Sequence, residues 1–331
     1  METRKVQLTG GSTYTVSLPK EWATENGIEA GSEVEFHQEG NSLLLTPKRD
    51  AEHTEGTIDV TDLHGERLTR AVITMYVSGF DIINLDGETI DADQRRTIRE
   101  AAQSLVGVEV LEETSNRVVV QDLLDSSELS VHNAVTRMRL IARSMLEDAV
   151  AALIDNDDDL AESVIDRDDD ADRLYFVVSR IFRATLRSPR AIEELGVPRE
   201  VCFDYHYSAR QLERISDHAA KISHIQRDLG DISEEVGTAL SSLYEAVVTV
   251  IDTALDALFE DDSDRSMELA HDARESILEI DEHTRTIDEL LMDLDPHQAQ
   301  SLGLIVDSLS RSADYGGNIA ETALQNAAPK P

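Results

Sequence analysis

The sequence predicts a multi-domain protein: a small N-terminal β module, an α/β middle segment, and an all-α C-terminal region made of a pair of three-helix bundles. Three observations predict it. Short alternating runs fill residues 1–50, strand and helix patterns alternate over residues 51–122, and helical periodicity continues from residue 123 with an internal repeat. A chain of 331 residues with 40% hydrophobic content can form several cores.

Residues 1–50 have the pattern of two strand pairs around a short helix. RKVQLTGG and STYTVSLP alternate about a Gly10–Gly11 turn, PKEWATENG predicts a helical turn, and SEVEFHQ and SLLLTPK predict two more strands. One side of the first pair carries Val6, Leu8, Tyr14, Val16 and Leu18. Because this apolar set is small, we expect a second copy of the chain to cover it in a homodimer or a higher homo-oligomer.

The stretch RKVQLTGGSTYTVSLPKEW, followed by GIEAGSEVEF and LLLTP, resembles the AbrB/SpoVT family of swapped-hairpin β barrels, which includes antitoxins of the MazE kind. The resemblance covers about 45 residues. It implies a dimer that binds DNA, with Arg4, Lys5, Ser12, Tyr14 and Lys20 as the contacting residues. The alternative is a barrel that serves only for dimerisation, because acids flank these bases.

Residues 51–122 predict a connecting α/β domain. GTIDV precedes a helical GERLTRAVITMYVSG, FDIINL forms a strand, a helix runs from Asp91 to Leu105, and GVEVLEE and RVVVQDLL form two strands across a turn. The segment contains no Gly-rich phosphate loop and no nucleophile elbow. A spacer or an interface is the expected role, with ligand sensing as the alternative.

From residue 123 the sequence predicts two copies of a three-helix unit, over residues 123–229 and 230–327, with a tail at 328–331. RQLERISDHAAKIS at 210 recurs as DSLSRSADYGGNIAE at 307, which aligns Asp217 with Asp314. The expected helices span about 128–155, 157–187 and 202–229, then 232–260, 264–293 and 297–326, with PRAIEELGVP as a linker.

The stretch LERISDHA raises the question of which way its acids point. Glu213 and Asp217 lie four residues apart and fall about 150° from the apolar residues of the same helix. They are therefore expected on the outer face. The simplest interpretation of one such pair is a solvated helix surface with local acid–arginine contacts.

The duplicated unit resembles PhoU, a regulator of phosphate uptake, over about 200 residues. The resemblance implies an acid-x-x-x-Asp motif on the second and third helices of each repeat, whose carboxylates hold metal ions. The first repeat keeps both motifs, as Asp168 with Asp172 and Glu213 with Asp217. In the second repeat Thr284 precedes Asp288 and Ser310 precedes Asp314, so only the distal Asp remains in each.

Carboxylates one turn apart, facing a similar pair on a neighbouring helix, suit a hard or borderline cation. Iron, zinc, magnesium and manganese are all compatible with such ligands. The rival interpretation is ordinary acidic decoration, because acids are plentiful throughout this chain, as in DRDDDADR.

The composition limits the function. The net charge is −37, and the bases are 25 Arg and 5 Lys, which favours a protein adapted to a salt-rich cytoplasm that screens self-repulsion. The alternative, a generally acidic mesophilic protein, explains the low Lys content and the even spread of acids less well. DNA binding through bulk charge is excluded, so any DNA contact must be local. Cys202 is the only cysteine, which excludes an internal disulfide. No signal peptide or apolar membrane span is evident, so we expect a cytoplasmic protein without membrane insertion.

These observations predict a phosphate-responsive regulator that binds promoters through its head and a metal through its helical sensor. The alternative is an adaptor that never touches DNA, dimerises through residues 1–50 and docks on the ATPase subunit of a phosphate ABC transporter. We do not expect an enzyme, because no catalytic triad pattern is present; a metal-dependent hydrolase is the remaining alternative. The domain combination resembles archaeal proteins, and the acidic composition fits a haloarchaeal one.

Overall fold

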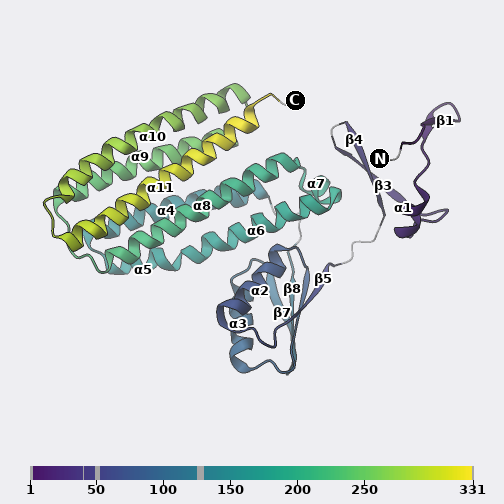
Figure 1. The fold of residues 1–331 in the computed structure, drawn as a ribbon, viewed down its shortest axis with the longest axis horizontal. Helices are drawn as coiled ribbons and strands as arrows, with labels where there is room; N and C mark the ends of the chain where they lie inside the picture. Colours follow the sequence, from purple (N-terminus) through teal and green to yellow (C-terminus); the bar gives the residue numbers. More distant parts are fainter. Residues whose placement is uncertain (1–2, 40, 49–52, 125–129, 330–331) are drawn as a thin grey trace. The chain divides into compact units, whose positions relative to one another are not determined.

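The computed structural model describes residues 3–39, 41–48, 53–124 and 130–329, in two compact units, residues 1–53 and 54–331. It confirms the predicted fold class, with a small β region, an α/β segment and a helical region in chain order (Figure 1). The boundary predicted at 50 and 51, residues 128–129 of the first expected helix, and residues 330–331 of the tail lie outside the described residues.

The first unit contains two antiparallel hairpins. Its elements are β1 (Gln7–Thr9), β2 (Thr13–Thr15), α1 (Lys20–Glu25), β3 (Val34–Glu39) and β4 (Ser42–Pro47), with β1 paired to β2 and β3 paired to β4. Gly10 and Gly11 turn the first hairpin with φ of 63° and 80°, which other residues adopt rarely. The strands β1 and β2 are shorter than predicted, and the described residues of a single chain form two separate sheets, not a closed barrel.

The apolar side chains of this unit have no core to enter. Among its residues whose side chains are described, only His37 is buried. Leu8 and Tyr14, which pair across the first hairpin, are 61% and 76% exposed. The other exposed apolar side chains include Val6, Val16, Phe36 and Leu43. A second copy could cover this apolar surface.

Residues 54–124 form a four-stranded sheet with two helices. The elements are β5 (Glu55–Asp59), α2 (Gly65–Val77), β6 (Ile82–Asp86), α3 (Ala92–Gln103), β7 (Val108–Glu113) and β8 (Arg117–Asp122). The strand order is β5-β6-β8-β7, and only β5 and β6 are parallel, as the helical crossover between them allows. Leu68 of α2 and Ile98 of α3 share one core with alternate residues of the strands, such as Leu85 of β6 and Val120 of β8.

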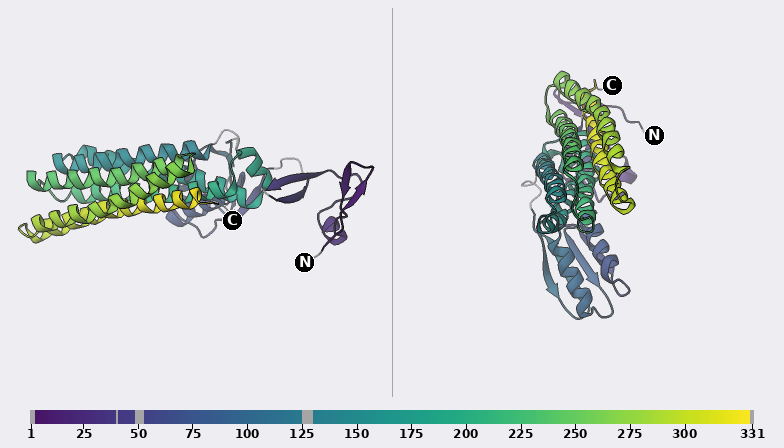
Figure 2. Two further views of the ribbon diagram at one scale, coloured as in Figure 1. Left: turned by 90° about the horizontal axis from the view of Figure 1, so that it is seen from above. Right: turned by 90° about the vertical axis from the view of Figure 1, so that its left-hand side faces the viewer.

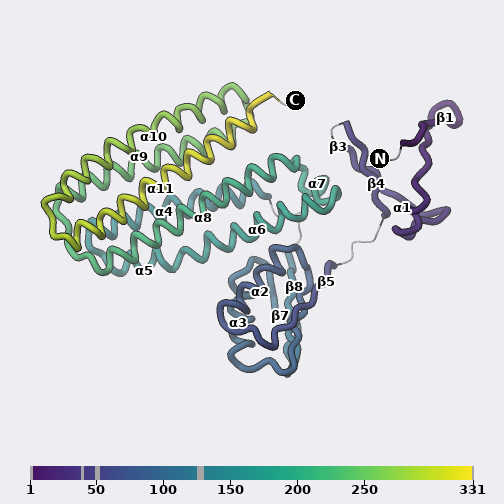
Figure 3. Tube along the Cα trace, in the orientation of Figure 1, coloured from purple at the N-terminus to yellow at the C-terminus, as the bar shows by residue number. Residues whose placement is uncertain are grey.

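The helical region begins with α4 (Val131–Asp155), α5 (Asp158–Asp166), α6 (Asp168–Arg187), α7 (Pro189–Leu195) and α8 (Arg199–Gln226). It continues with α9 (Glu234–Phe259), α10 (Ser263–Leu291) and α11 (Pro296–Ala327). Contacts join α8 to α4 and α6 in the first repeat and to α11 in the second, so the repeats lie side by side (Figures 2 and 3).

Two details differ from the sequence prediction. The helix expected over 157–187 is interrupted at Arg167. The Arg167 side chain donates a hydrogen bond to the Ser163 carbonyl, and the Arg167 backbone N–H donates to the Val164 carbonyl, three residues back, instead of continuing the helical pattern. The expected linker contains the helix α7. Pro189 occupies its first turn, and Gly196, with φ of 64°, caps its C-terminal end.

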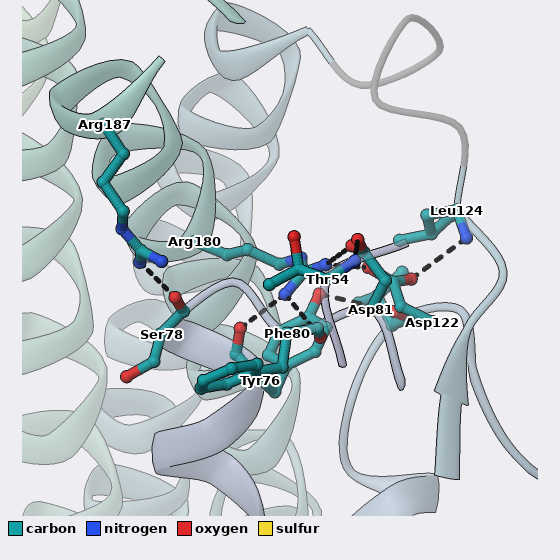
Figure 4. A network of polar contacts seen from close by, with 10 residues as sticks. Thr54, Tyr76, Ser78, Phe80, Asp81, Asp122, Leu124, Arg180 and Arg187 are labelled. Carbon is teal, nitrogen blue, oxygen red and sulfur yellow. Dashed lines mark hydrogen bonds and ion pairs between the residues drawn. The ribbon is translucent and has the colours of Figure 1, made fainter. Parts of the chain in front are cut away.

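Arg180 of α6 joins the helical region to the α/β domain (Figure 4). Its guanidinium donates to the backbone carbonyls of Tyr76 and Phe80 at 2.7 and 3.0 Å, and pairs with Asp81 at 2.6 Å and Asp122 at 2.9 Å. The side chains of Arg180 and Asp122 are only 13% and 7% exposed. This buried ion pair therefore fixes α6 against α2 and the end of β8.

In the described residues, no helix is both long and apolar enough to cross a membrane.

Candidate metal centre and nucleic-acid interface

The four acids of the first repeat lie on two adjacent helices. Asp168 and Asp172 occupy the first turns of α6, and Glu213 and Asp217 lie in the middle of α8, which packs against α6. The charge of Asp217 acts on Asp168, and the charge of Asp172 acts on Glu213. The structure therefore brings together all four residues predicted for the first site, as two opposed pairs.

This gathering raises the proton affinity of the acids. Burial, followed by the charge of Asp217, raises the pKa of Asp168 to about 6. Burial, followed by the charge of Asp168, raises the pKa of Asp172 to about 6, and burial with Asp217 raises that of Glu213 to about 7. Negative charge is thus unfavourable at this position unless a cation neutralises it.

The expectation that both α8 acids lie on the outer face is wrong for Glu213. Its side chain is buried at 7% exposure, whereas Asp217 is exposed. Helical periodicity assumes one buried face, but α8 contacts α4, α6 and α11 and is covered on several sides. Glu213 Oε1 accepts from Arg210 at 2.5 Å, and the buried Oε2 has no hydrogen-bond partner.

The unpartnered oxygen of Glu213 fits a site that takes a cation, since a buried carboxylate oxygen without a donor is costly. As their side chains stand, no three His, Cys, Asp or Glu residues in the described parts of the chain are positioned to hold a metal ion. Binding would require rotamer changes that bring Asp168, Asp172, Glu213 and Asp217 onto one ion. A bound cation would supply the neutralising charge there.

The second repeat has hydroxyl groups where the first has acids. Thr284 Oγ1 on α10 lies 3.4 Å from Ser310 Oγ on α11, so these residues face each other. In the first repeat the charge of Asp172 acts on Glu213 between the corresponding helices. Partial desolvation and the charges of Asp281 and Asp307 raise the pKa of Asp314, against the opposing charge of Arg311.

Asp281 is therefore a residue that the motif alignment missed. The predicted pair was Asp288 with Asp314, but Asp288 is not among the acids whose charge acts on Asp314, whereas Asp281, which is likewise exposed, is. Asp281 precedes Thr284 by three residues, which places it one helical turn away on a similar face. A search at three-residue as well as four-residue spacing would have found it.

The five residues predicted to contact DNA are spread over the N-terminal unit. Arg4 and Lys5 precede β1, Ser12 lies in the turn after Gly11, and Lys20 begins α1; all are exposed. Tyr14 lies in β2 and pairs with Leu8, on the face that also carries Val6 and Val16. The structure thus places Tyr14 with the apolar set.

Two segments of the chain match known protein families. Residues 135–225 match the PhoU domain. The match runs from α4 almost to the end of α8 and includes all four acids of the first repeat, whereas the second repeat lies outside it. Residues 7–53 match a second family, described as "Antidote-toxin recognition MazE, bacterial antitoxin". A comparison with curated protein sequences found no match.

Two solved structures are similar to the helical region. PhoU from Pseudomonas aeruginosa is 26% identical with a TM-score of 0.51, and the match covers 59% of this chain and 93% of that one. The phosphate transport system regulatory protein PhoU from Streptococcus pneumoniae is 17% identical with a TM-score of 0.44, over 59% and 91%.

Proposed function

We propose that this protein is a cytoplasmic, non-enzymatic regulator of phosphate uptake that responds to phosphate, binds promoters as a homodimer and carries a metal-binding helical sensor. The observation that carries the proposal is the occurrence of a PhoU domain match and a MazE match in one chain. The PhoU match supports regulation of phosphate transport. The MazE match supports a DNA-binding or oligomerising head.

Dimerisation is supported by the absence of an apolar core among the described residues of the head. Leu8 and Tyr14 expose most of their surface, and Phe36 and Leu43 are 59% and 64% exposed. Leu8→Asp should convert the dimer to a monomer in sedimentation experiments, while Leu278→Asp, which alters a 73% exposed leucine in α10, should not. A dimer that survives the change at Leu8 would contradict this part of the proposal.

The decisive experiment maps chromatin occupancy of a tagged copy in phosphate-rich and phosphate-starved cells. We expect discrete promoter peaks that change with phosphate. The double variant Arg4→Glu and Lys5→Glu should lose them, because reversed charges repel the DNA backbone. The matched control, Arg67→Glu with Arg70→Glu on α2, makes the same charge change on exposed residues of the α/β domain and should retain the peaks.

The second candidate function is an adaptor that dimerises through the head and acts on a phosphate ABC transporter without binding DNA. The acidity of the head favours it: residues 1–50 carry five bases against eight acids. Under this alternative, no promoter peaks form in either phosphate state. Regulation of uptake then survives the Arg4 and Lys5 changes intact.

A further inference from the structure

The first repeat carries an exposed surface, where α6 ends and α8 begins, that neither proposed function uses. We call it the aromatic surface: Phe182 and Leu186 of α6, and Phe203 and Tyr207 of α8. Leu186, Phe203 and Tyr207 are 55%, 48% and 38% exposed. The Phe203 ring lies 5.9 Å from Phe182 and 6.3 Å from Tyr207, so the surface is continuous across the two helices. Aromatic residues make up only 4% of this chain, which makes the concentration unusual.

An exposed arginine lies beside this surface. Residues 173–210 contain seven arginines against four acids, but Arg180 and Arg210 are paired with acids outside this range, so the charge that remains available is that of Arg183. Arg183 follows Phe182 directly and is exposed, and it has no hydrogen bond or ion pair with any other residue that the structure describes. Arg183 also acts electrostatically on His206, whose ring stacks on Phe182 at 4.7 Å. A free positive charge therefore borders the aromatic surface.

We propose that the aromatic surface docks an acidic, apolar-faced helical segment of a protein partner. Aromatic side chains and arginine are the residues enriched at the centre of protein interfaces, and Phe203, Tyr207 and Arg183 are of these kinds. The spacing of four residues on each helix of the aromatic surface matches the ridge of apolar residues on an amphipathic helix. The local positive charge selects an acidic partner and repels basic ones.

A nucleic acid suits this surface less well. The rings already stack on one another, Phe182 on His206 at 20° and Phe203 on Tyr207 at 28°, and therefore offer fewer free faces to bases. A long polyanion would also extend from the small positive region onto the acidic remainder of the chain. A short acidic segment of protein need not extend so far.

A second copy of this chain is also disfavoured at this surface. A symmetric dimer contact presents the same residues from both subunits, which would bring Arg183 towards its own counterpart. The docking proposal does not depend on DNA binding by the head or on metal binding by the acids. Failure of either leaves it unaffected.

The test measures binding of a fluorescent, helical Glu/Leu amphipathic peptide to the full-length protein by anisotropy, at fixed KCl. We expect saturable binding that Phe203→Ser and Arg183→Glu each weaken by about tenfold or more, the loss typical of an interface anchor. The matched control is Arg285→Glu, which makes the same charge change at an exposed residue of α10 and should bind like the wild type. Unchanged thermal melts would show that the variants fold.

Five results would overturn the proposal. Equal binding by Phe203→Ser, Arg183→Glu and the wild type would place the peptide elsewhere, and no binding by the wild type would remove the acidic helix as ligand. Tighter binding of a Lys/Leu peptide would contradict the charge argument. Displacement of the peptide by a single-stranded oligonucleotide, or a change in oligomeric state with Phe203→Ser, would assign the surface to nucleic acid or to a second copy.

Discussion

The two helical repeats are copies of one unit that differ in two places. Both contain three long helices, and the third begins in register, since Arg199 of α8 and Pro296 of α11 are 97 residues apart, as are Asp217 and Asp314. In the first repeat, four acids gather between α6 and α8. In the second, Thr284 and Ser310 occupy the facing positions, and Asp281 and Asp314 are the acids beside them.

The second difference is the length of the middle helix. The motif alignment places Thr284 at the position of Asp168, but Thr284 lies beside Ser310, the counterpart of Glu213, and it is the charge of Asp172 that acts on Glu213. Thr284 therefore corresponds to Asp172 in the structure.

In this register Arg180, eight residues after Asp172, corresponds to Met292, just beyond the end of α10. Residues 180–187 of α6 therefore have no counterpart in α10. This extension carries Arg180, which holds the α/β domain. It also carries Phe182 and Leu186 of the aromatic surface, and Arg183 beside that surface.

The shared unit supplies the scaffold, and the departures from the repeat supply the contacts. The shared core extends through both repeats with the same kinds of residue, such as Ile215 and Leu309. The acids and the α6 extension occur in the first repeat alone. We therefore expect substitutions of the acids and of the α6 extension to change metal binding or stability, and the equivalent substitutions in the second repeat to have small effects on both.

The largest expected effect is that of Arg180→Ala. Removing the guanidinium leaves Asp81 and Asp122 facing each other, and burial already raises the pKa of Asp122. The free energy of unfolding should fall by about 3–5 kcal/mol, measured by urea denaturation. The control is Arg187→Ala, which removes an exposed arginine that donates a hydrogen bond to the Ser78 carbonyl, and it should change stability far less. Equal effects would show that the ion pair does not hold the domains together.

A second metal site should be obtainable in the other repeat. Thr284→Asp with Ser310→Glu would place two new acids beside Asp281 and Asp314, as in the first repeat. Elemental analysis by mass spectrometry should show one more ion bound per chain than in the wild type. An unchanged content, in a folded variant, would mean that four acids between two such helices are insufficient.

The acids of the first repeat should make stability depend on pH in the metal-free protein. Folding raises the pKa values of Asp168 and Asp172 to about 6 and that of Glu213 to about 7, from ordinary values of 3.8 and 4.5. The folded state therefore holds these protons more tightly than the unfolded state. Their contribution to stability is full below the unfolded pKa values and is lost as pH rises through about 6 to 7.

Glu213→Gln isolates that pH effect. The amide cannot ionise, so the stability of the variant should decline less than that of the wild type between about pH 4.5 and pH 7. The measurement is the thermal midpoint across this range with a chelator present. A decline identical to that of the wild type would contradict the raised pKa of Glu213.

The smallest effect is expected for Thr284→Ala with Ser310→Ala. The contact between the two hydroxyls is long, at 3.4 Å, and Thr284 otherwise bonds to the Ile280 carbonyl of its own helix. The loss should be about 1 kcal/mol or less by urea denaturation. A much larger loss would show that the hydroxyl positions are structural in a way that the first repeat does not share.

The sequence predicted the fold class and the helix order well, because alternation and helical periodicity are local signals. It also placed Asp168, Asp172, Glu213 and Asp217 together, through the repeat and the family resemblance. It missed the burial of Glu213 because one helix cannot reveal how many neighbours cover it. Asp281 and the Arg180 ion pair were missed for a similar reason: each depends on which residues meet across helices or domains, and no single-helix spacing encodes that.

The most direct test of the account is the metal content of three purified proteins after exposure to iron, zinc, magnesium or manganese and removal of free ions. We predict that the wild type retains an ion, that Glu213→Ala with Asp217→Ala loses it, and that Asp288→Ala with Asp314→Ala retains it. Unchanged content in the first variant, or an equal loss in the second, would contradict the assignment of the sensor to the four acids of the first repeat.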